Sequence, residues 1–201
     1  MVQYWQVLNL DRRELLGQEP RGEIADILLS GVPDALVSHL RVEEAQRGRW
    51  AGNRIVVVSD RAVEYPEGML TAQEQEEVED MYLDEKGEGE YDEDDPAPTL
   101  YAFAEEWYTA VTAENGPGRA GKEWHLRNLS KKEYVRSDGV AGLGQAVVVS
   151  TCWTNEEEAG VRAGQWAGDR LEIREAGAEP EAGWADISAE VGRAMAVMSA
   201  E

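Results

Sequence analysis

The stretch "RWAGNRIVVV" at residues 49–58 returns in altered form as "QWAGDRLEIR" at residues 165–174. A second pair lies upstream, since "WQVLNLDRRE" begins at Trp5 and "WHLRNLSKKE" begins at Trp124. The two motifs follow each other at spacings that differ by only three residues between the copies. Self-similarity of this kind is the sequence signature of an internal repeat. The sequence therefore predicts two copies of one structural unit.

The first copy contains about 40 residues that the second lacks, because a third, weaker pair of motifs is spaced differently. This pair is "VTAENG" from Val111 and "ISAEVG" from Ile187. The extra region includes Glu74–Asp95, with 13 acidic residues against one Lys, and its Gly-rich half is expected to be a solvated, dispensable loop. A calcium loop is the alternative, but "DEKGEGEYDEDD" lacks the alternating order and terminal Glu of an EF-hand.

Residue patterns predict an α+β fold. "YWQVLNL", "NRIVVVSD" and "DRLEIR" have the composition of strands, and "LLG" and "YVR" are short second strands that follow turns. Helices are expected over "DALVSHLRV" after Pro33 and over "TAQEQEEVEDMY", where Thr71 and Glu74 form a capping-box pattern. "GQAVVVSTCW", at 144–153, fits either a strand or a helix. Each copy is expected to be a small antiparallel sheet with helices, related to the other by a pseudo-two-fold axis.

Two apolar stripes with helical spacing predict two more helices. They consist of Leu100, Phe103, Trp107 and Val111, and of Ile187, Val191, Met195 and Met198. The chain then divides into a repeat 1 core at 1–66, a helical and acidic insertion with the end of repeat 1 at 67–117, and repeat 2 at 118–201. We expect these parts to form one compact domain.

Composition points to an intracellular globular protein. Of the 201 residues, 42% are hydrophobic, and no apolar run is long enough to span a membrane. The N-terminal residues lack the pattern of a secretory signal, and Cys152, the single cysteine, permits no internal disulfide. These features lead us to expect a cytoplasmic location.

The net charge of −22 bears on the partners. Such a field repels nucleic acid and anionic membrane surfaces and attracts a cationic protein. The sequence contains no dinucleotide-binding fingerprint, Walker loop, zinc-protease motif or nucleophile elbow. We therefore expect no cofactor and no metal, and the oligomeric state is left open.

The W-A-G-[DN]-R motif supplies the candidate site residues. A Trp is more often a core anchor than a pocket wall, and a repeated Arg and Glu are more often structural than catalytic. We therefore expect Arg54 and Arg170 to hold the fold, with Glu14 or Glu133 as an attractive partner. A ligand between the halves would instead be oriented by Trp50, Trp166, Asp169, Arg170 and Glu133.

The two motifs N-L-[DS]-[RK]-[RK]-E and W-A-G-[DN]-R resemble those of an uncharacterised group of mushroom-type fungal proteins, with looser bacterial relatives. In that group a "NLDKRE" opening and a "WAGDR" strand entry recur. The resemblance covers both halves of the chain but not the acidic insertion, and it departs at Asn53, where the group has the Asp seen here at Asp169. It implies a shared fold and assigns no catalytic residues.

Three classes of function remain. A non-enzymatic binding or interaction scaffold is favoured, with a small-molecule-binding protein or enzyme as the alternative, its pocket lined by Trp and Tyr between the repeats. A storage or structural protein is the third class. Cys152 with His125 as its base is a further enzyme hypothesis, but no local signature supports it over a buried, inert thiol.

Overall fold

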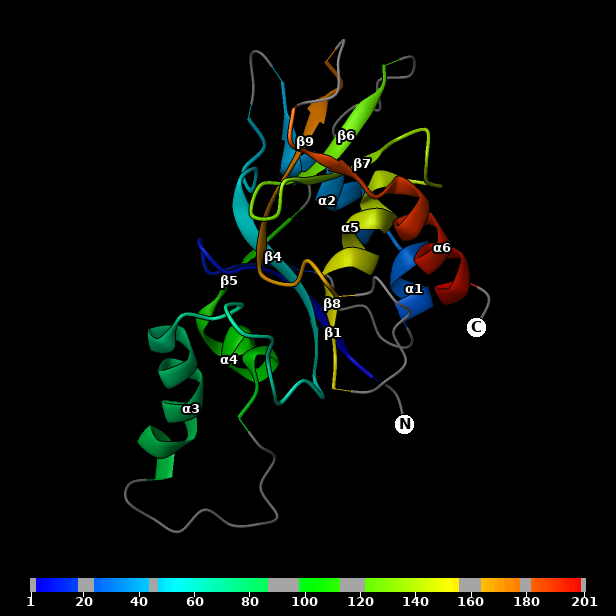
Figure 1. Ribbon diagram of the computed structural model, residues 1–201. Helices are drawn as coiled ribbons and strands as arrows, with labels where there is room; N and C mark the ends of the chain where they lie inside the picture. The colour runs from blue at the N-terminus through cyan, green and yellow to red at the C-terminus, as the bar shows by residue number, and fades with distance from the viewer. Residues whose placement is uncertain are drawn as a thin grey trace.

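Within the residues described, a ten-stranded mixed sheet forms the centre of the molecule (Figure 1). The computed structural model describes residues 3–17, 24–43, 47–86, 98–112, 122–155, 164–177 and 182–199. Eight strands lie side by side in the order β10-β7-β6-β9-β4-β1-β2-β5, while β3 pairs with β9 and β8 pairs with β4. Helices pack against this sheet, so the expected α+β class is confirmed. The expectation of a small antiparallel sheet in each copy is wrong, because the strands of both halves join in one sheet that also contains parallel pairs.

We call residues 3–112 the first half of the chain and residues 122–199 the second half. The strands of the first half are β1 (Trp5–Asn9), β2 (Glu14–Leu16), β3 (Arg41–Val42), β4 (Asn53–Ser59) and β5 (Thr109–Val111). Those of the second half are β6 (Trp124–Asn128), β7 (Glu133–Arg136), β8 (Cys152–Trp153), β9 (Asp169–Glu175) and β10 (Ala185–Asp186). The helices are α1 (Ile24–Leu29), α2 (Val32–Leu40), α3 (Ala72–Lys86), α4 (Leu100–Trp107), α5 (Leu143–Thr151) and α6 (Ser188–Met198).

The pairing of strands follows the same scheme in both halves. β1 pairs antiparallel with β2 and β4, and Asn9 lies opposite Glu14. β6 pairs antiparallel with β7 and β9, and Asn128 lies opposite Glu133. The short outer strands β5 and β10 run parallel to β2 and β7. Read inward from its two edges, the sheet therefore shows the same arrangement of strands in each half, β5-β2-β1-β4 and β10-β7-β6-β9.

The two halves meet at the antiparallel pair β4 and β9, where Arg54 lies opposite Arg170. The strand after helix α2 is β3, which pairs with β9, and the strand after helix α5 is β8, which pairs with β4. Each half thus adds a strand beside the long strand of the other. Helices α2 and α5 also touch, since a Cβ built on Gly144 would fall on the backbone of Pro33. The junction is therefore filled by strand pairing and by direct backbone contact.

Alternation along the strands gives the sheet two different faces. One face packs against α1, α2, α5 and α6 in a core cluster that takes residues from both halves. On the other face, α4 packs over β1 and β4 and α3 packs against α4, at the lower left of Figure 1. We call the face that carries α3 and α4 the outer face.

The segment 144–153, which the sequence left open, is a helix followed by a strand. Helix α5 contains the run Val147, Val148 and Val149, and its chain continues as β8. Branched residues disfavour a helix only weakly, and packing overrides this preference where the helix is enclosed. Eight of the nine residues of α5 are buried, so tertiary burial decides its conformation.

The other predicted helices are confirmed, with two corrections. The helix expected over "DALVSHLRV" ends at Leu40, because the chain becomes extended at Arg41 and Arg41–Val42 pair with β9 as strand β3. Helix α4 ends at Trp107, whose surface is 58% exposed, and Val111 lies in strand β5, so the stripe expected from Leu100 to Val111 is wrong beyond Phe103. The physical reason is that the chain becomes extended at Tyr108 and pairs with β2. The C-terminal stripe is buried on and beside α6, as expected.

Helix α3 begins with the predicted capping box. The Thr71 hydroxyl accepts from the Glu74 backbone N–H at 3.2 Å, and the Glu74 carboxylate accepts from the Thr71 backbone N–H at 2.7 Å. Of the acidic segment 84–95, residues 87–95 lie outside the described residues, as do the side chains of 84–86. In the part of the chain that is described, no helix combines the length and apolar character needed to cross a bilayer.

Candidate functional site

Each W-A-G corner buries its Trp and satisfies the indole N–H with a Glu. Trp50 donates to Glu14 at 2.7 Å, and Trp166 donates to Glu133 at 2.7 Å. Both indoles are almost fully buried in the same core cluster, as favoured for a core anchor. A glycine with positive φ turns the chain into the following strand at each corner, so this turn needs residues without a Cβ.

The expected pairing of Glu14 or Glu133 with the arginine of its motif is wrong. Leu16, two residues after Glu14 in β2, packs in the core that also holds Trp50, so Glu14 points to that side. Ile55 packs in this core as well, so its neighbour Arg54 points to the outer face. Strand alternation therefore separates the two groups, and the same reasoning applies to Glu133 and Arg170.

In both halves, an Asn side chain links the turn after the first strand to the W-A-G corner. The Asn9 side-chain carbonyl accepts from the Arg12 backbone N–H at 3.1 Å, and the Asn9 amide donates to Asn53 at 3.2 Å. Asn128 accepts from backbone N–H groups of its own turn and donates to Asp169 at 2.8 Å. Asn53 and Asp169 therefore each bond across the corner to the Asn at the end of the preceding strand.

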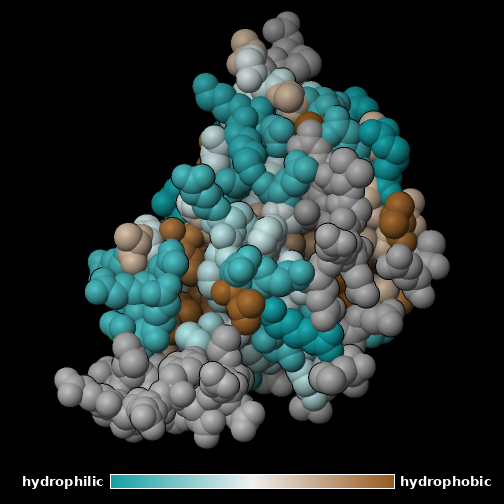
Figure 2. All heavy atoms as spheres, turned by 60° about the horizontal axis from the view of Figure 1, so that its bottom comes forward, coloured by the Kyte–Doolittle hydropathy of each residue, from teal (hydrophilic) through white to brown (hydrophobic). Residues whose placement is uncertain are grey.

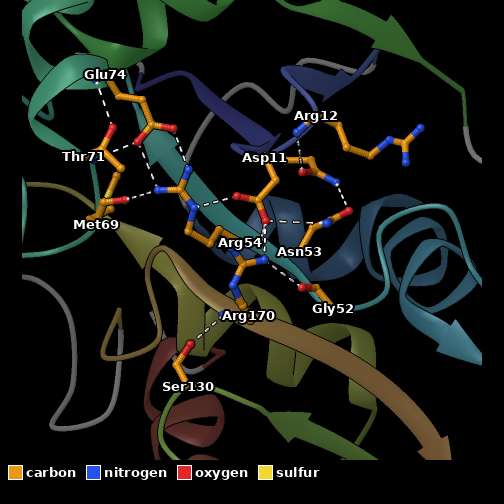
Figure 3. Close-up of polar contacts among 11 residues, drawn as sticks. Asp11, Arg12, Gly52, Asn53, Arg54, Met69, Thr71, Glu74, Ser130 and Arg170 are labelled. Atoms are coloured by element: carbon orange, nitrogen blue, oxygen red, sulfur yellow. Dashed lines mark hydrogen bonds and ion pairs between the residues drawn. The ribbon is translucent and has the colours of Figure 1, made fainter.

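Arg54 lies on the outer face and is enclosed by acceptors (Figure 3). Its Nη1 and Nη2 donate to the Glu74 carboxylate at 3.0 and 2.5 Å, and its Nε donates to Asp11 at 2.7 Å. Nη1 also donates to the Met69 carbonyl at 3.3 Å. Glu74 belongs to the first turn of α3, so this fork attaches the inserted helix to the sheet.

Arg170 lies beside Arg54 and shares one of its acceptors. Its Nη1 donates to Asp11 at 2.5 Å and to the Gly52 carbonyl at 3.1 Å. Its backbone N–H donates to the Ser130 hydroxyl at 3.0 Å, whereas the backbone N–H of Arg54 donates to the Asp11 carboxylate at 3.2 Å. Ser130 therefore takes the backbone contact that Asp11 makes in the first half, without its charge.

These contacts change the ionisation of the cluster. Burial alone would raise the pKa of Asp11, but hydrogen bonds and charge from Arg54, with the charge of Arg170, lower this pKa below its ordinary value. The pKa of Glu74 is likewise lowered by Arg54 and Thr71 against the opposing effect of burial. The Glu74 hydrogen bonds raise the pKa of Arg54. Both carboxylates are therefore ionised at neutral pH and complement the two guanidiniums.

The outer face differs in chemistry between the halves. Leu8 lies opposite Val56 beneath the inserted helices, where both belong to an apolar cluster. At the matching position of the second half, Arg127 lies opposite Glu172 and is paired with it at 3.0 Å. The Trp184 ring stacks on the Arg127 guanidinium, with 4.3 Å between the ring centroid and Cζ. The apolar side chains that α3 and α4 turn toward the sheet, such as Val78 and Phe103, would find no apolar surface to pack on here.

The five candidate ligand-binding residues do not form one exposed group. Trp50 and Trp166 are buried, and Glu133 is bonded to the second of these rings. Asp169 is bonded to Asn128 and forms an ion pair with Lys131 at 2.8 Å. Only Arg170 has a side chain about half exposed, at 49%.

Asp11 and Glu74, the two carboxylates that bond Arg54, are not among the candidate site residues. Asp11 occupies the one position of the first motif where a carboxylate is replaced by a hydroxyl in the second copy, and this difference was a usable signal. The sequence pattern indicates Glu74 only as part of the capping box. Its bond to Arg54 joins residues 20 positions apart, and no local pattern in the sequence indicates it.

Cys152 has the properties of an inert thiol. Burial raises the pKa of its thiol to about 12, and the sulfur donates to the Val149 carbonyl at 3.3 Å. His125 lies on β6, with its ring 4.9 Å from that of Tyr134 and its Nε2 3.5 Å from Glu123. These contacts do not join the thiol to a base. Among the described residues no group of three or more His, Cys, Asp or Glu side chains is arranged to hold a metal ion.

Comparison with known proteins adds no relative, since no family model, no curated protein and no solved structure matches this chain.

Proposed function

We propose that this chain is a non-enzymatic intracellular binding protein, built from two copies of one unit, whose inserted helix α3 presents an acidic surface to a cationic protein partner. The observation that carries the proposal is the way α3 is held. Two ion pairs hold it in position, one from Arg54 of β4 to Glu74 and one from Arg13, in the turn between β1 and β2, to Glu77. A helix fixed in this way offers its remaining acidic side chains at low entropic cost to a partner.

The duplication is supported by contacts that recur pair by pair. Each half has a strand, a turn with an Asn, a second strand, a nine-residue helix and a W-A-G corner, in the same order. Each corner closes the same indole-to-Glu bond and the same bond from the turn Asn. Arg13 and Lys132 also share a positive φ, of 51° and 56°, which is uncommon outside glycine. Independent origins would have no reason to reproduce these details together.

A pseudo-two-fold axis between the halves would pass near the Arg54 and Arg170 pair. These residues occupy matching positions in the two motifs and lie opposite each other in the sheet. The Gly52 backbone N–H donates to the Leu171 carbonyl at 2.7 Å, and the Gly168 N–H donates to the Ile55 carbonyl at 2.9 Å. The exchange of β3 and β8 between the halves obeys the same symmetry.

The acidic surface that we propose for binding consists of Glu76, Glu79 and Asp80 of α3. These side chains are exposed, whereas Glu74 and Glu77 face the sheet as ion-pair partners. Hydrophilic residues cover this helix in Figure 2. In a chain of net charge −22, such a surface attracts cationic proteins and repels nucleic acid and anionic membranes.

The alternative of a Trp- and Tyr-lined pocket between the halves has less support. Trp50 and Trp166 already fill the core, and their N–H groups are bonded within it. The backbones of α2 and α5 touch where the halves meet. A ligand there would have to separate packed helices.

The proposal is tested with two triple variants of equal net charge. The first changes the α3 surface by Glu76→Gln, Glu79→Gln and Asp80→Asn. The control changes the second half by Glu123→Gln, Asp138→Asn and Glu175→Gln, whose side chains are about half exposed. Affinity for a short oligolysine peptide is measured by calorimetry at low and at physiological salt.

The α3 variant should lose most of the affinity and its salt dependence, while the control should keep them. An equal loss in both variants would show that the peptide responds only to net charge, and the α3 surface would then have no special role.

A further inference from the structure

We propose that the guanidinium of Arg170 is a binding site for a carboxylate carried by a polypeptide partner. This site is distinct from the acidic surface on α3 and does not depend on it. It lies on the outer face at the junction of the halves, beside Asp11 and Ser130 (Figure 3).

The first half shows what a filled site of this kind contains. Arg54, at the matching position, receives the Glu74 carboxylate end-on through two N–H···O bonds of 3.0 and 2.5 Å. A planar guanidinium and a carboxylate match each other in this two-bond geometry. The occupant is a Glu side chain in the first turn of a helix, and a polypeptide partner could present the same group to Arg170.

The guanidinium of Arg170 is held in place and only partly used. Nη1 is fixed by Asp11 and by the Gly52 carbonyl. In the described part of the chain, neither Nε nor Nη2 of Arg170 has a hydrogen-bond partner. These two atoms form one edge of the fork, and an edge of two parallel N–H donors is the complement of a carboxylate. Because Nη1 is already fixed, binding orders the side chain less than it would order a free arginine.

The edge is open because two features that enclose Arg54 differ at Arg170. In the first half, Asp11 accepts from both the backbone N–H and the Nε of Arg54. In the second half, Ser130 accepts from the backbone N–H of Arg170 but is too short to reach further along the side chain. The second half also lacks an insertion that would bring a residue like Glu74. Arg170 therefore has neither a carboxylate at its Nε nor a helix residue equivalent to Glu74, although Asp11 still accepts from its Nη1.

The experiment follows the Nε–H resonances of the arginines by NMR while carboxylate probes are added at constant ionic strength. The probes are a blocked tripeptide with a central Glu, a tripeptide with a free C-terminal carboxylate, and acetate. A blocked tripeptide with a central Gln is the neutral control. Arg174 is the internal reference, since it lies on the same strand and face and is 51% exposed.

The expected result is a saturable shift of the Arg170 resonance with the Glu peptide, with little change at Arg54 and Arg174. A larger effect of the free C-terminus would still support a polypeptide partner and would place the carboxylate at the end of its chain, whereas a larger effect of acetate would contradict a polypeptide partner. Equal shifts at Arg170 and Arg174, or an equal effect of the Gln peptide, would overturn the proposal.

Three variants sharpen the test. Arg170→Lys keeps the charge but removes the fork together with its Nε–H, so binding is followed there by the backbone amide resonances of β9, and it should weaken by about 10-fold or more. Arg174→Lys is the matched control and should bind as the unchanged protein does. Ser130→Asp places a carboxylate where Asp11 stands in the first half, so it should occupy Nε of Arg170 and block the probe in a folded protein. Unchanged binding to Ser130→Asp would contradict the assigned edge.

Discussion

Arg54 and Arg170 face each other across β4 and β9, yet their guanidiniums have different surroundings. The Arg54 side chain is 15% exposed and fully bonded, whereas that of Arg170 is 49% exposed and bonded through one nitrogen. Removing an enclosed guanidinium leaves partly buried carboxylates without partners, and this costs more than losing an exposed ion pair. The two arginines therefore contribute differently to stability despite their matching positions.

Arg54→Ala should lower the free energy of unfolding by about 1 to 3 kcal/mol, because Glu74 and Asp11 each lose a charged partner. Arg170→Ala should cost less, on the order of 0.2 to 1 kcal/mol, because its pair with Asp11 is more exposed. Urea unfolding at neutral pH, followed by Trp fluorescence, measures both losses. Equal losses would contradict the difference in enclosure.

Glu14 should make stability depend on pH in the acid range. Hydrogen bonds from Arg49 lower its pKa to about 2 from an ordinary value of 4.5, with help from Trp50 and Arg12 and against the effect of burial. Because the folded-state pKa is depressed, the contribution is fully present above pH 4.5 and is lost as the pH falls toward 2.

The loss of stability in Glu14→Gln, relative to the unchanged protein, should therefore be larger at about pH 7 than at about pH 3. Glu76→Gln, at an exposed position of α3, is the control and should show little change in either condition. If the loss of stability in Glu14→Gln is independent of pH, the carboxylate charge is not what stabilises the corner.

At the scale of elements, the close contact of α2 and α5 holds the two halves together on the inner side of the sheet. Gly144 allows it, since a side chain there would meet the backbone of Pro33 rather than a flexible group. Gly otherwise weakens a helix by about 1 kcal/mol relative to Ala. This cost is offset because, without a Cβ at this position, the backbones of α2 and α5 can approach each other.

Gly144→Ala should lower the free energy of unfolding by about 1 to 3 kcal/mol, because the added methyl group forces the two helices apart. This outcome is opposite in sign to the gain expected from helix propensity alone. Gly17→Ala is the control, since its Cβ would lie 3.7 Å from Ala110, an ordinary contact. Thermal unfolding compares the two variants, and a stabilised Gly144→Ala would refute the close approach.

The elements that the sequence predicted correctly are those encoded by local patterns. The strands that end at Asn9 and Asn128 and the capping box at Thr71 depend on neighbouring or repeated residues. The helix α5 depends on burial among other elements, so its valines left the choice between strand and helix open. The bond from Glu74 to Arg54 depends on how the insertion docks, and the direction of Glu14 depends on strand alternation across the whole sheet.

For the whole molecule, we propose that one unit occurs twice and that only the arginine of the first copy is fully enclosed by acceptors. Glu74 and Asp11 enclose Arg54, while Ser130 and the missing insertion leave an edge of Arg170 open. The acidic helix that closes the first copy also carries the surface that we propose for a cationic partner. Duplication followed by divergence at a few positions would thus produce a rigid frame with two different recognition surfaces.

The most direct test of this claim is the exchange rate of the Nε protons of Arg54 and Arg170 with water, measured by NMR in the unchanged protein and in Ser130→Asp. The account predicts slow exchange at Arg54 and fast exchange at Arg170 in the unchanged protein, because only the Arg54 proton is bonded to a carboxylate. In Ser130→Asp, the exchange at Arg170 should slow toward that of Arg54, since matching units would place the new carboxylate on the same atom. Equal rates in the unchanged protein, or no slowing at Arg170 in the folded variant, would contradict the equivalence of the two units.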